Sequence, residues 1–216
     1  MRIDIWSDVV CPWCYLGKRR FERALDTFED RAEVQIVHRS FQLDPTRPTG
    51  ETQKRREMLM AKYHLTAAQV EALDRRMEQT AAADGLEYHL GDGVTGNTLD
   101  AHRLLHLAAD RGRQDAVLER FYRAYFTEGR SLFDDDSLTA LSAEAGLDEQ
   151  DVRQVLAGDA YAAAVAADIR EAQALGASGV PFFVFDNRFG VSGAQGTDVF
   201  AQVLARARES RVPSSR

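Results

Sequence analysis

Residues 4–16, Asp-Ile-Trp-Ser-Asp-Val-Val-Cys-Pro-Trp-Cys-Tyr-Leu, contain both cysteines of this 216-residue chain, Cys11 and Cys14. The two residues between them let both sulfurs lie on the first turn of a helix and close a small disulfide ring. Residues 2–10 have strand-like character, and Pro12 suits the first position of a helix, because proline lacks the N–H that a helix leaves unpaired there. Beyond the second cysteine, apolar residues recur at mostly helical spacing. The sequence therefore predicts that a strand, a turn and a helix N-terminus meet at Cys11.

This position favours thiol chemistry. The unpaired backbone N–H groups and the positive end of the helix dipole stabilise a thiolate, so Cys11 is the expected nucleophile. Cys14 lies one turn further in, where we expect it to be more shielded and to attack a mixed disulfide as the resolving thiol. Pro12 and Trp13 are expected to set the exposure of the ring, and Trp13 offers apolar surface to a substrate beside the reactive sulfur.

Three plainer interpretations of the two cysteines compete with this one. A structural disulfide over two residues would constrain almost no chain. Half of a zinc site would need ligands that the sequence does not arrange, because there is no second CxxC pair and none of the five histidines has finger spacing. Two inert buried cysteines would not explain why both fall at a strand-to-helix junction. We therefore predict a redox-active pair and no bound metal.

Residues 7–17, Ser-Asp-Val-Val-Cys-Pro-Trp-Cys-Tyr-Leu-Gly, resemble the active-site segment of DsbA-like thioredoxin-fold oxidoreductases. The resemblance is closest to the FrnE-type members, a group described as dithiol-disulfide isomerases. Residues 179–185, Gly-Val-Pro-Phe-Phe-Val-Phe, resemble the segment in which this family carries a cis-proline facing the CxxC pair. Further matches at residues 97–103, Asn-Thr-Leu-Asp-Ala-His-Arg, and residues 191–195, Val-Ser-Gly-Ala-Gln, complete an ordered set that spans nearly the whole chain.

The resemblance implies an α/β protein with a thioredoxin fold, in which a mixed sheet is flanked by helices and carries a large all-helical insertion. We expect residues 1–43 and 177–209 to form the thioredoxin-like domain, residues 44–176 to form the helical insertion, and residues 210–216 to form a flexible tail. The first boundary falls where two prolines and a glycine break the pattern after the second strand.

Local patterns place the individual elements. Side chains of residues 32–41 alternate between two faces, which predicts a second strand. Residues 182–192 are predicted to form a hairpin, and residues 86–96 a glycine-rich loop. Thr66 opens a capping box, and the acidic run that starts at Asp134 suits a helix N-terminus. The expected helices cover residues 52–63, 66–83, 97–109, 115–127, 137–145, 149–156, 160–175 and 197–208.

Other site residues follow from the resemblance. Pro181 is expected to form the cis bond, so that Val180 offers its N–H and C=O to an extended substrate as an added strand would. Asn97 is expected to cap a helix and is also a candidate for substrate contact. His102 is expected to approach the CxxC pair and tune it. Asp8 would oppose a thiolate that it faced, or it would relay protons.

Charge and apolar patterning narrow the range of partners. The formal charge of −7 gives no support to binding of a nucleic acid backbone. No apolar window reaches the length of a membrane span and no leader pattern precedes the active-site segment, so we expect no membrane contact and a cytoplasmic location. There, thiols are kept largely reduced. Expected partners are protein or small-molecule thiols and disulfides, with glutathione as the candidate redox partner, no cofactor bound, and both monomer and homodimer left open.

The leading hypothesis is a thiol-disulfide oxidoreductase or isomerase of the DsbA-like family that uses Cys-Pro-Trp-Cys, with the direction of electron flow open. An alternative is a glutathione-dependent isomerase or transferase, since the region around Asn97 also resembles 2-hydroxychromene-2-carboxylate isomerase relatives. Those proteins usually carry a serine at the position of Cys11. A third hypothesis is a non-catalytic binding module or holdase.

Overall fold

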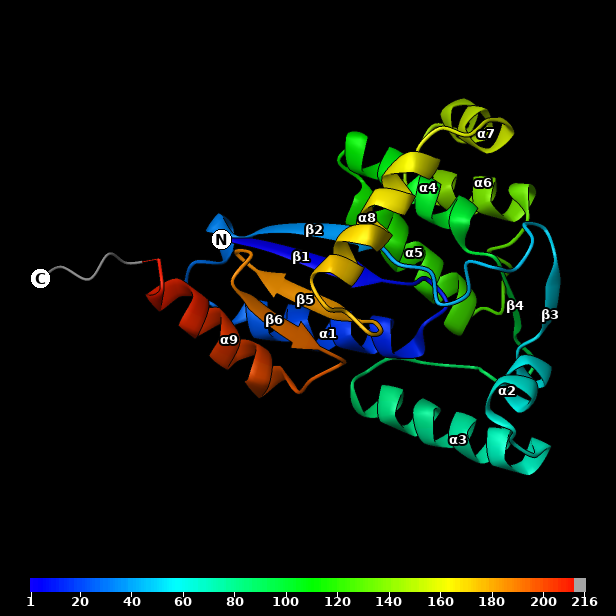
Figure 1. The fold of residues 1–216 in the computed structure, drawn as a ribbon, viewed down its shortest axis with the longest axis horizontal. Helices are drawn as coiled ribbons and strands as arrows, with labels where there is room; N and C mark the ends of the chain where they lie inside the picture. The colour runs from blue at the N-terminus through cyan, green and yellow to red at the C-terminus, as the bar shows by residue number, and fades with distance from the viewer. Residues whose placement is uncertain (212–216) are drawn as a thin grey trace, which may run out of the picture.

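A mixed sheet forms the centre of residues 1–211, the part of the chain that the computed structural model describes (Figure 1). The first and second strands are parallel, and the fifth strand is antiparallel to both of its neighbours. Helix α1 (Pro12–Asp26) connects the two parallel strands. In the order in which they pair, the strands of this sheet are β2 (Gln35–Ser40), β1 (Arg2–Ser7), β5 (Phe182–Phe185) and β6 (Phe189–Ser192).

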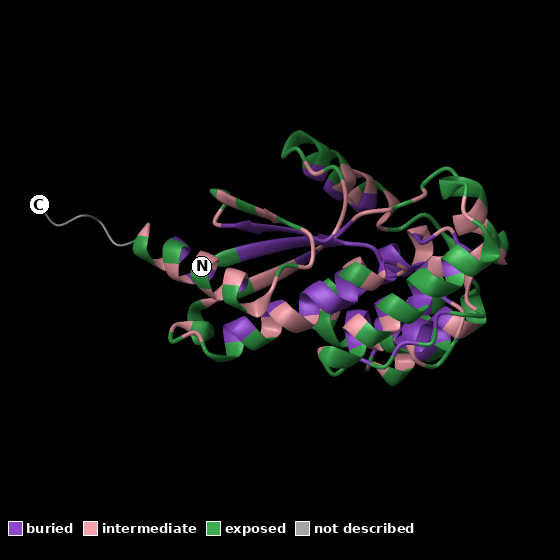
Figure 2. Cartoon of the chain, turned by 90° about the horizontal axis from the view of Figure 1, so that it is seen from below, coloured by how far each residue is buried: buried purple, intermediate pink, exposed green. Residues whose placement is uncertain are grey.

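Side chains of the two central strands alternate between the faces of the sheet, as a pleated strand requires. One face packs Ile3, Ile5, Phe183 and Phe185 against α1 and α9 (Thr197–Glu209). The other face packs Trp6, Phe182 and Val184 against Ala172 of α8 (Ala162–Ala174). In Figure 2 the central strands are mostly buried, while the outward faces of the surrounding helices are exposed.

All helices from α2 to α8 lie between β2 and β5 in the sequence. The largest apolar cluster joins side chains of α4 to α7 with Cys11, Cys14, Tyr15 and Leu16. The helical segment therefore packs directly on the helix that carries both cysteines. Besides α8, these helices are α2 (Arg55–Tyr63), α3 (Ala67–Ala83), α4 (Leu99–Asp110), α5 (Gln114–Phe126), α6 (Asp135–Glu144) and α7 (Glu149–Ala157).

Local signals in the sequence located several helix starts. Thr66 and Gln69 form both bonds of the predicted capping box at the start of α3. Asp134 accepts a hydrogen bond of 2.8 Å from the backbone N–H of Ser137 and so caps α6.

Other expectations were wrong. The predicted helix over residues 52–63 begins only at Arg55, because β3 (Thr52–Lys54) pairs with β4 (Val94–Gly96), which lies in the predicted loop. These two short strands form a ribbon through distant pairing, which local periodicity does not reveal. The second strand starts at Gln35, after a 3₁₀ turn.

The predicted tail is also corrected in part. Ser210 is the C-cap residue of α9, and the Arg211 guanidinium donates a hydrogen bond of 3.0 Å to Asp186. The predicted flexible tail therefore does not begin at residue 210. Residues 212–216 lie outside the described residues.

Candidate active site

The two cysteines lie where β1 leads into α1. Cys11 is the N-cap residue, and Pro12 occupies the first turn of the helix. The backbone N–H of Cys11 donates to the Asp8 carbonyl, and the backbone N–H of Cys14 donates to the Cys11 carbonyl, each at 3.0 Å. Both cysteines are free thiols. The predicted meeting of strand, turn and helix N-terminus at Cys11 is confirmed.

The two thiols differ in their access to a cavity of about 440 Å³ that opens beside the helix N-terminus. Cys11 lines this cavity although its exposed fraction is only 4%, and Cys14, at 2%, does not line it. Burial raises the pKa of the Cys14 thiol well above its ordinary value, and a hydrogen bond with Cys11 raises it further. Cys11 is therefore the sulfur that an occupant of the cavity meets, with Cys14 protonated behind it.

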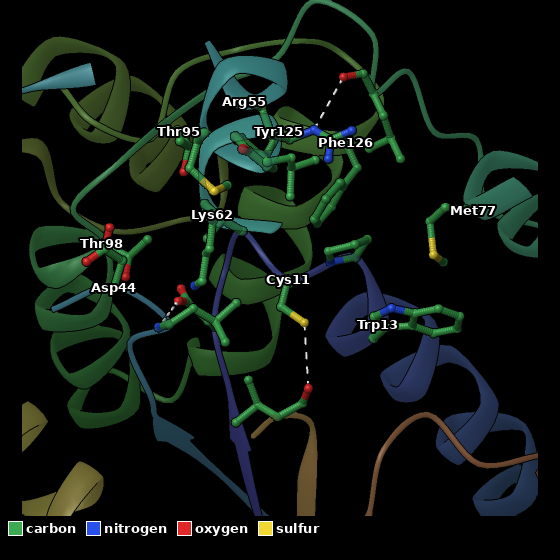
Figure 3. Close-up of a pocket in the computed structure, with 18 of the residues that line it drawn as sticks. Cys11, Trp13, Asp44, Arg55, Lys62, Met77, Thr95, Thr98, Tyr125 and Phe126 are labelled. Atoms are coloured by element: carbon green, nitrogen blue, oxygen red, sulfur yellow. Dashed lines mark hydrogen bonds between the residues drawn. The ribbon is translucent and has the colours of Figure 1, made fainter. Parts of the chain in front are cut away.

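The segment that precedes β5 faces Cys11 across the site. The Val180–Pro181 peptide bond is cis, and the Cys11 Sγ lies 3.7 Å from the Val180 carbonyl oxygen, an interaction drawn as a dashed line in Figure 3. Gly17 of α1 allows the close approach, since a Cβ at that position would lie 3.0 Å from Pro181 Cγ. The structure thus brings Cys11, Val180 and Pro181 together, with Val180 lining the cavity beside Cys11.

Asp8 and His102 form a buried pair next to the cysteines. Their exposed fractions are 1% and 0%, and His102 Nε2 lies 3.3 Å from Asp8 Oδ1. The other Asp8 oxygen accepts a hydrogen bond of 2.7 Å from the Leu43 backbone N–H. Within residues 1–211, His102 makes no hydrogen bond to either cysteine. It therefore reaches the CxxC segment through Asp8, three residues before Cys11, and its tuning role stays a prediction.

Asn97 ties a loop to the start of α4. Its Oδ1 accepts hydrogen bonds from the Leu99 backbone N–H at 2.8 Å and from Gln42 Nε2 at 2.9 Å, and its Nδ2 donates to the Arg47 carbonyl. The N-cap residue of α4 is Thr98, one position later than predicted, but its side chain makes no capping bond. Asn97 does not line the cavity, and its contact with substrate stays a prediction.

Stacked aromatic rings support the first turn of α1 from the side of the helical segment. Tyr15 lies 4.8 Å from Tyr122 between ring centroids, and Tyr88 lies 4.8 Å from Phe126. The Tyr88 hydroxyl donates a hydrogen bond of 2.8 Å to the Pro12 carbonyl. Burial, followed by a hydrogen bond with Glu119, raises the pKa of Tyr15 to about 12. These contacts hold the CxxC turn in place.

Comparison with known proteins agrees with this geometry. The family described as DSBA-like thioredoxin domain matches residues 2–205. The chain belongs to this family. Its fold is the thioredoxin fold with helices inserted between β2 and β5, as the sequence resemblance implied.

Individual proteins differ widely in their similarity to this chain. The probable DsbA oxidoreductase SCO1869 from Streptomyces coelicolor is 51% identical, with a TM-score of 0.95 over 100% of this chain and 93% of that one. The cytosolic disulfide reductase DsbM from Pseudomonas aeruginosa, solved with GSH, shares the fold at 22% identity, with a TM-score of 0.64 over 96% of this chain and 100% of that one. The uncharacterized protein YwbO from Bacillus subtilis (strain 168) is 24% identical over 98% of this chain and 99% of its own length.

Four residues predicted for the site line the cavity of this DsbA-like chain, namely Cys11, Pro12, Trp13 and Val180. Trp13 is 48% exposed and lies near Cys11 in Figure 3. Other walls come from α2 and α3, which were predicted only as parts of the helical insertion and not as site elements. One signal was present, because Met58, Leu59 and Tyr63 recur on one face of an otherwise charged helix.

Two further properties concern residues 1–211 only. No three His, Cys, Asp or Glu side chains in that range are grouped so as to hold a metal ion. Nor does that range contain a helix with the length and apolar character needed to cross a membrane.

Proposed function

We propose that this chain catalyses thiol-disulfide exchange, with Cys11 and Cys14 as its redox-active pair. The main support is the placement of the Cys11 thiol, which lies at a helix N-terminus, lines a cavity and faces the Val180 carbonyl at 3.7 Å. A helix N-terminus stabilises a thiolate, and the cavity gives a substrate access to it.

The reaction proceeds by two displacements when the chain reduces its substrate. The Cys11 thiolate attacks one sulfur of a substrate disulfide, whose S–S bond breaks as a mixed disulfide with Cys11 forms. The other substrate sulfur leaves as a thiolate and takes up a proton. Cys14 then loses its proton and attacks the Cys11 sulfur, so that a Cys11–Cys14 disulfide forms and the second substrate thiol leaves. Counted from the dithiol form, in which Cys11 releases its proton before the attack, the chain loses two electrons and two protons, and the substrate gains both.

The raised pKa of Cys14 keeps it out of the first step. While Cys14 stays protonated, it does not compete with Cys11 for the substrate disulfide. The same steps in reverse start from the Cys11–Cys14 disulfide, so oxidase and isomerase activities would use the same sulfurs.

Val180 supports binding of an extended substrate. Its carbonyl faces Cys11, and its backbone N–H has no hydrogen-bond partner within the described residues. A substrate strand that pairs with this backbone would bring its sulfur to Cys11. Pro12 and Trp13 would contact the same substrate from the other side of the cavity.

Glutathione is the proposed redox partner. Two glutathione molecules would return the oxidised chain to the dithiol form and leave as glutathione disulfide. The structural likeness to DsbM, which was solved with GSH, supports this choice. A reducing compartment such as the cytosol would keep the pair reduced between cycles.

Reduction of insulin disulfides by glutathione tests the function. The wild-type chain should accelerate the reaction. Cys11→Ala should abolish the acceleration, because the remaining thiol, Cys14, is buried and does not line the cavity. Equal acceleration by Cys11→Ala would contradict the proposal and would leave a non-catalytic binding module or holdase as the better account.

A second candidate function is glutathione-dependent isomerisation of a small molecule. The cavity beside Cys11 favours it, as does the likeness of fold to 2-hydroxychromene-2-carboxylate isomerase, at 17% identity and a TM-score of 0.71 over 98% of this chain and 97% of that one. Replacement of Cys11 by Ser discriminates between the two. Turnover retained by Cys11→Ser would support isomerisation, and loss of turnover would support dithiol exchange.

A further inference from the structure

Exposed apolar side chains gather around the cavity beside Cys11. Among residues 1–211, five large apolar side chains are exposed, and four of them line this cavity. Such a gathering around a concave site marks a place where an apolar group binds. The four are Trp13, Leu43, Tyr63 and Leu73, whereas the fifth, Leu175, lies elsewhere.

Helix α2, which forms one wall of the cavity, has an apolar face with little else to pack against. No residue of α2 is buried, and Met58, Leu59 and Tyr63 of that helix all line the cavity. From α3, Leu73 and Met77 face the same space. Methionine side chains adapt to irregular shapes and make favourable contacts with aromatic rings. An aromatic occupant would therefore complete the packing of this face of α2.

The charges around the cavity leave one cation uncommitted. The lining carboxylates are engaged by donors of the chain itself: Asp8 by the Leu43 N–H, Asp44 by the Thr46 hydroxyl and Asp74 by Arg55. Within the described part of the chain, the Lys62 ammonium forms no ion pair.

The cavity also has a polar and an apolar side. In Figure 3, Lys62 lies on the left with Thr95, Thr98 and Asp44. Trp13 and Met77 lie on the right, with Cys11 between the two groups. An occupant that is apolar at one end and anionic at the other matches this division.

We propose that the cavity selects a low-molecular-weight disulfide, or the matching thiol, that has an aromatic body and a carboxylate. The body lies between α2 and α3, the carboxylate faces Lys62, and the sulfur meets Cys11. The cavity volume of about 440 Å³ is that of a site for a small organic molecule. This inference rests on the proposed exchange reaction, in which the disulfide takes two electrons and two protons from the Cys11 and Cys14 dithiol.

Three disulfide probes distinguish recognition of an aromatic ring from recognition of a carboxylate. Dithiobis(nitrobenzoate) is aromatic and anionic, dithiodipyridine is aromatic and neutral, and hydroxyethyl disulfide is small and neutral. The rate constant for oxidation of the reduced chain is measured with each disulfide. The ratio of the rate constants for two disulfides cancels any change in thiol reactivity that affects all three equally. The variants are Leu73→Ala with Leu175→Ala as its control, and Lys62→Gln with Lys54→Gln as its control. Both controls replace an exposed residue outside the cavity.

Leu73→Ala should lower the rate ratio of either aromatic disulfide to hydroxyethyl disulfide by about fivefold. This is less than the roughly tenfold that a methylene is worth in a closed apolar pocket, because Leu73 is half exposed. Lys62→Gln should lower the ratio of dithiobis(nitrobenzoate) to dithiodipyridine by about fivefold, because one charge contact is lost. Both controls should keep the wild-type ratios. Unchanged ratios in Leu73→Ala would overturn the proposal, and unchanged ratios in Lys62→Gln would overturn its anionic part. The rate of insulin reduction is measured in Leu73→Ala as well. If it falls as much as the rate of aromatic disulfide reduction, the proposal is overturned, and the cavity would instead bind an apolar side chain of a protein substrate.

A binding measurement separates this inference from the proposed function. An unreactive thioether, methylthio-nitrobenzoate, is titrated into Cys11→Ser and into the same chain with Leu73→Ala added. Binding that weakens by about fivefold on loss of the leucine supports the cavity assignment even if no disulfide is reduced. If none of the three disulfides oxidises the wild-type chain faster than it oxidises Cys11→Ser, the proposed exchange function is contradicted. The cavity assignment is not affected by that result. No binding of the thioether to Cys11→Ser would overturn the cavity assignment.

Discussion

The Cys11 sulfur lies 3.7 Å from the Val180 carbonyl oxygen, although Val180 follows it by 169 positions in the sequence. The contact joins the start of α1 to the segment that leads into β5. It depends on the pairing of β1 with β5, which is antiparallel and begins at Trp6 and Phe182. The central sheet therefore holds the thiol and the backbone proposed to bind substrate in one place.

Gly17 should be needed for this arrangement. In Gly17→Ala, the new Cβ would lie 3.0 Å from Pro181 Cγ and 3.4 Å from Ala194 Cα. Because a proline ring and a backbone atom yield little, we expect roughly a tenfold lower exchange rate from misplacement of the site and a loss of about 1–2 kcal/mol in stability from overpacking. Insulin reduction and urea unfolding measure the two effects. Gly91→Ala is the control, since nothing lies within 4 Å of its added Cβ, and an equal effect of both variants would contradict the argument.

The raised pKa of Cys14 predicts different alkylation of the two thiols. Burial is the largest cause of the raised pKa of Cys14, and it remains in Cys11→Ser. Alkylation of Cys14 by iodoacetamide in that variant should therefore be slow at neutral pH and should still be rising at pH 9. Cys11 in Cys14→Ser should react faster at pH 7. Mass spectrometry of timed samples gives both rates. Faster alkylation of Cys14 than of Cys11 at pH 7 would reverse the assigned roles.

Lys18 should stabilise the fold in a pH-dependent way. Its ammonium is buried and lies 2.9 Å from Glu119 and 3.1 Å from Asp115. Burial alone would raise the pKa of Glu119, but Lys18, Tyr15 and Arg19 together outweigh it and the pKa is lowered. A carboxyl group with a lowered folded-state pKa contributes stability above its unfolded pKa and loses it as the pH falls through the folded value.

Lys18→Met should therefore cost about 2 kcal/mol at pH 7, because it removes a buried cation from partly buried carboxylates. The loss should shrink at pH 3, where the carboxylates of the variant are largely protonated. Urea unfolding at both values measures the change, with the exposed Lys54→Met as control. An equal loss at pH 7 and pH 3 would mean that packing of the lysine, rather than its charge, stabilises the fold.

Asn97 should act on stability rather than on exchange. It links Leu99, Gln42 and Arg47, so Asn97→Ala should lower the free energy of unfolding by about 2 kcal/mol through the lost hydrogen bonds. Since Asn97 does not line the cavity, the folded variant should reduce insulin at nearly the wild-type rate. A large loss of activity at a temperature where circular dichroism shows a folded chain would instead support substrate contact.

The sequence predicted those features that are encoded locally. The CxxC pair with Pro12 predicted the helix start, and Thr66 and Asp134 marked the starts of two further helices. The cis-proline at Pro181 followed only from resemblance to a family. Its neighbour Val180 is brought to Cys11 by sheet pairing across most of the chain.

Features that depend on distant partners escaped prediction. Thr52–Lys54 has the charged character of the helix that follows it, and it becomes a strand only because Val94–Gly96 lies beside it. The Asp8 and His102 pair likewise needs β1 and α4 to pack together. Lys62 and Leu73 read as ordinary helix surface, and only the tertiary structure places both at the cavity next to Cys11.

Trapping of the mixed disulfide tests the central claim most directly. Cys14→Ser is mixed with a peptide disulfide, quenched with acid and analysed by mass spectrometry, with Cys11→Ser treated in parallel. We predict a stable adduct on Cys11 in Cys14→Ser and much slower modification of Cys14 in Cys11→Ser. No adduct on Cys11, or equal modification of both variants, would contradict the assignment of Cys11 as nucleophile and Cys14 as resolving thiol.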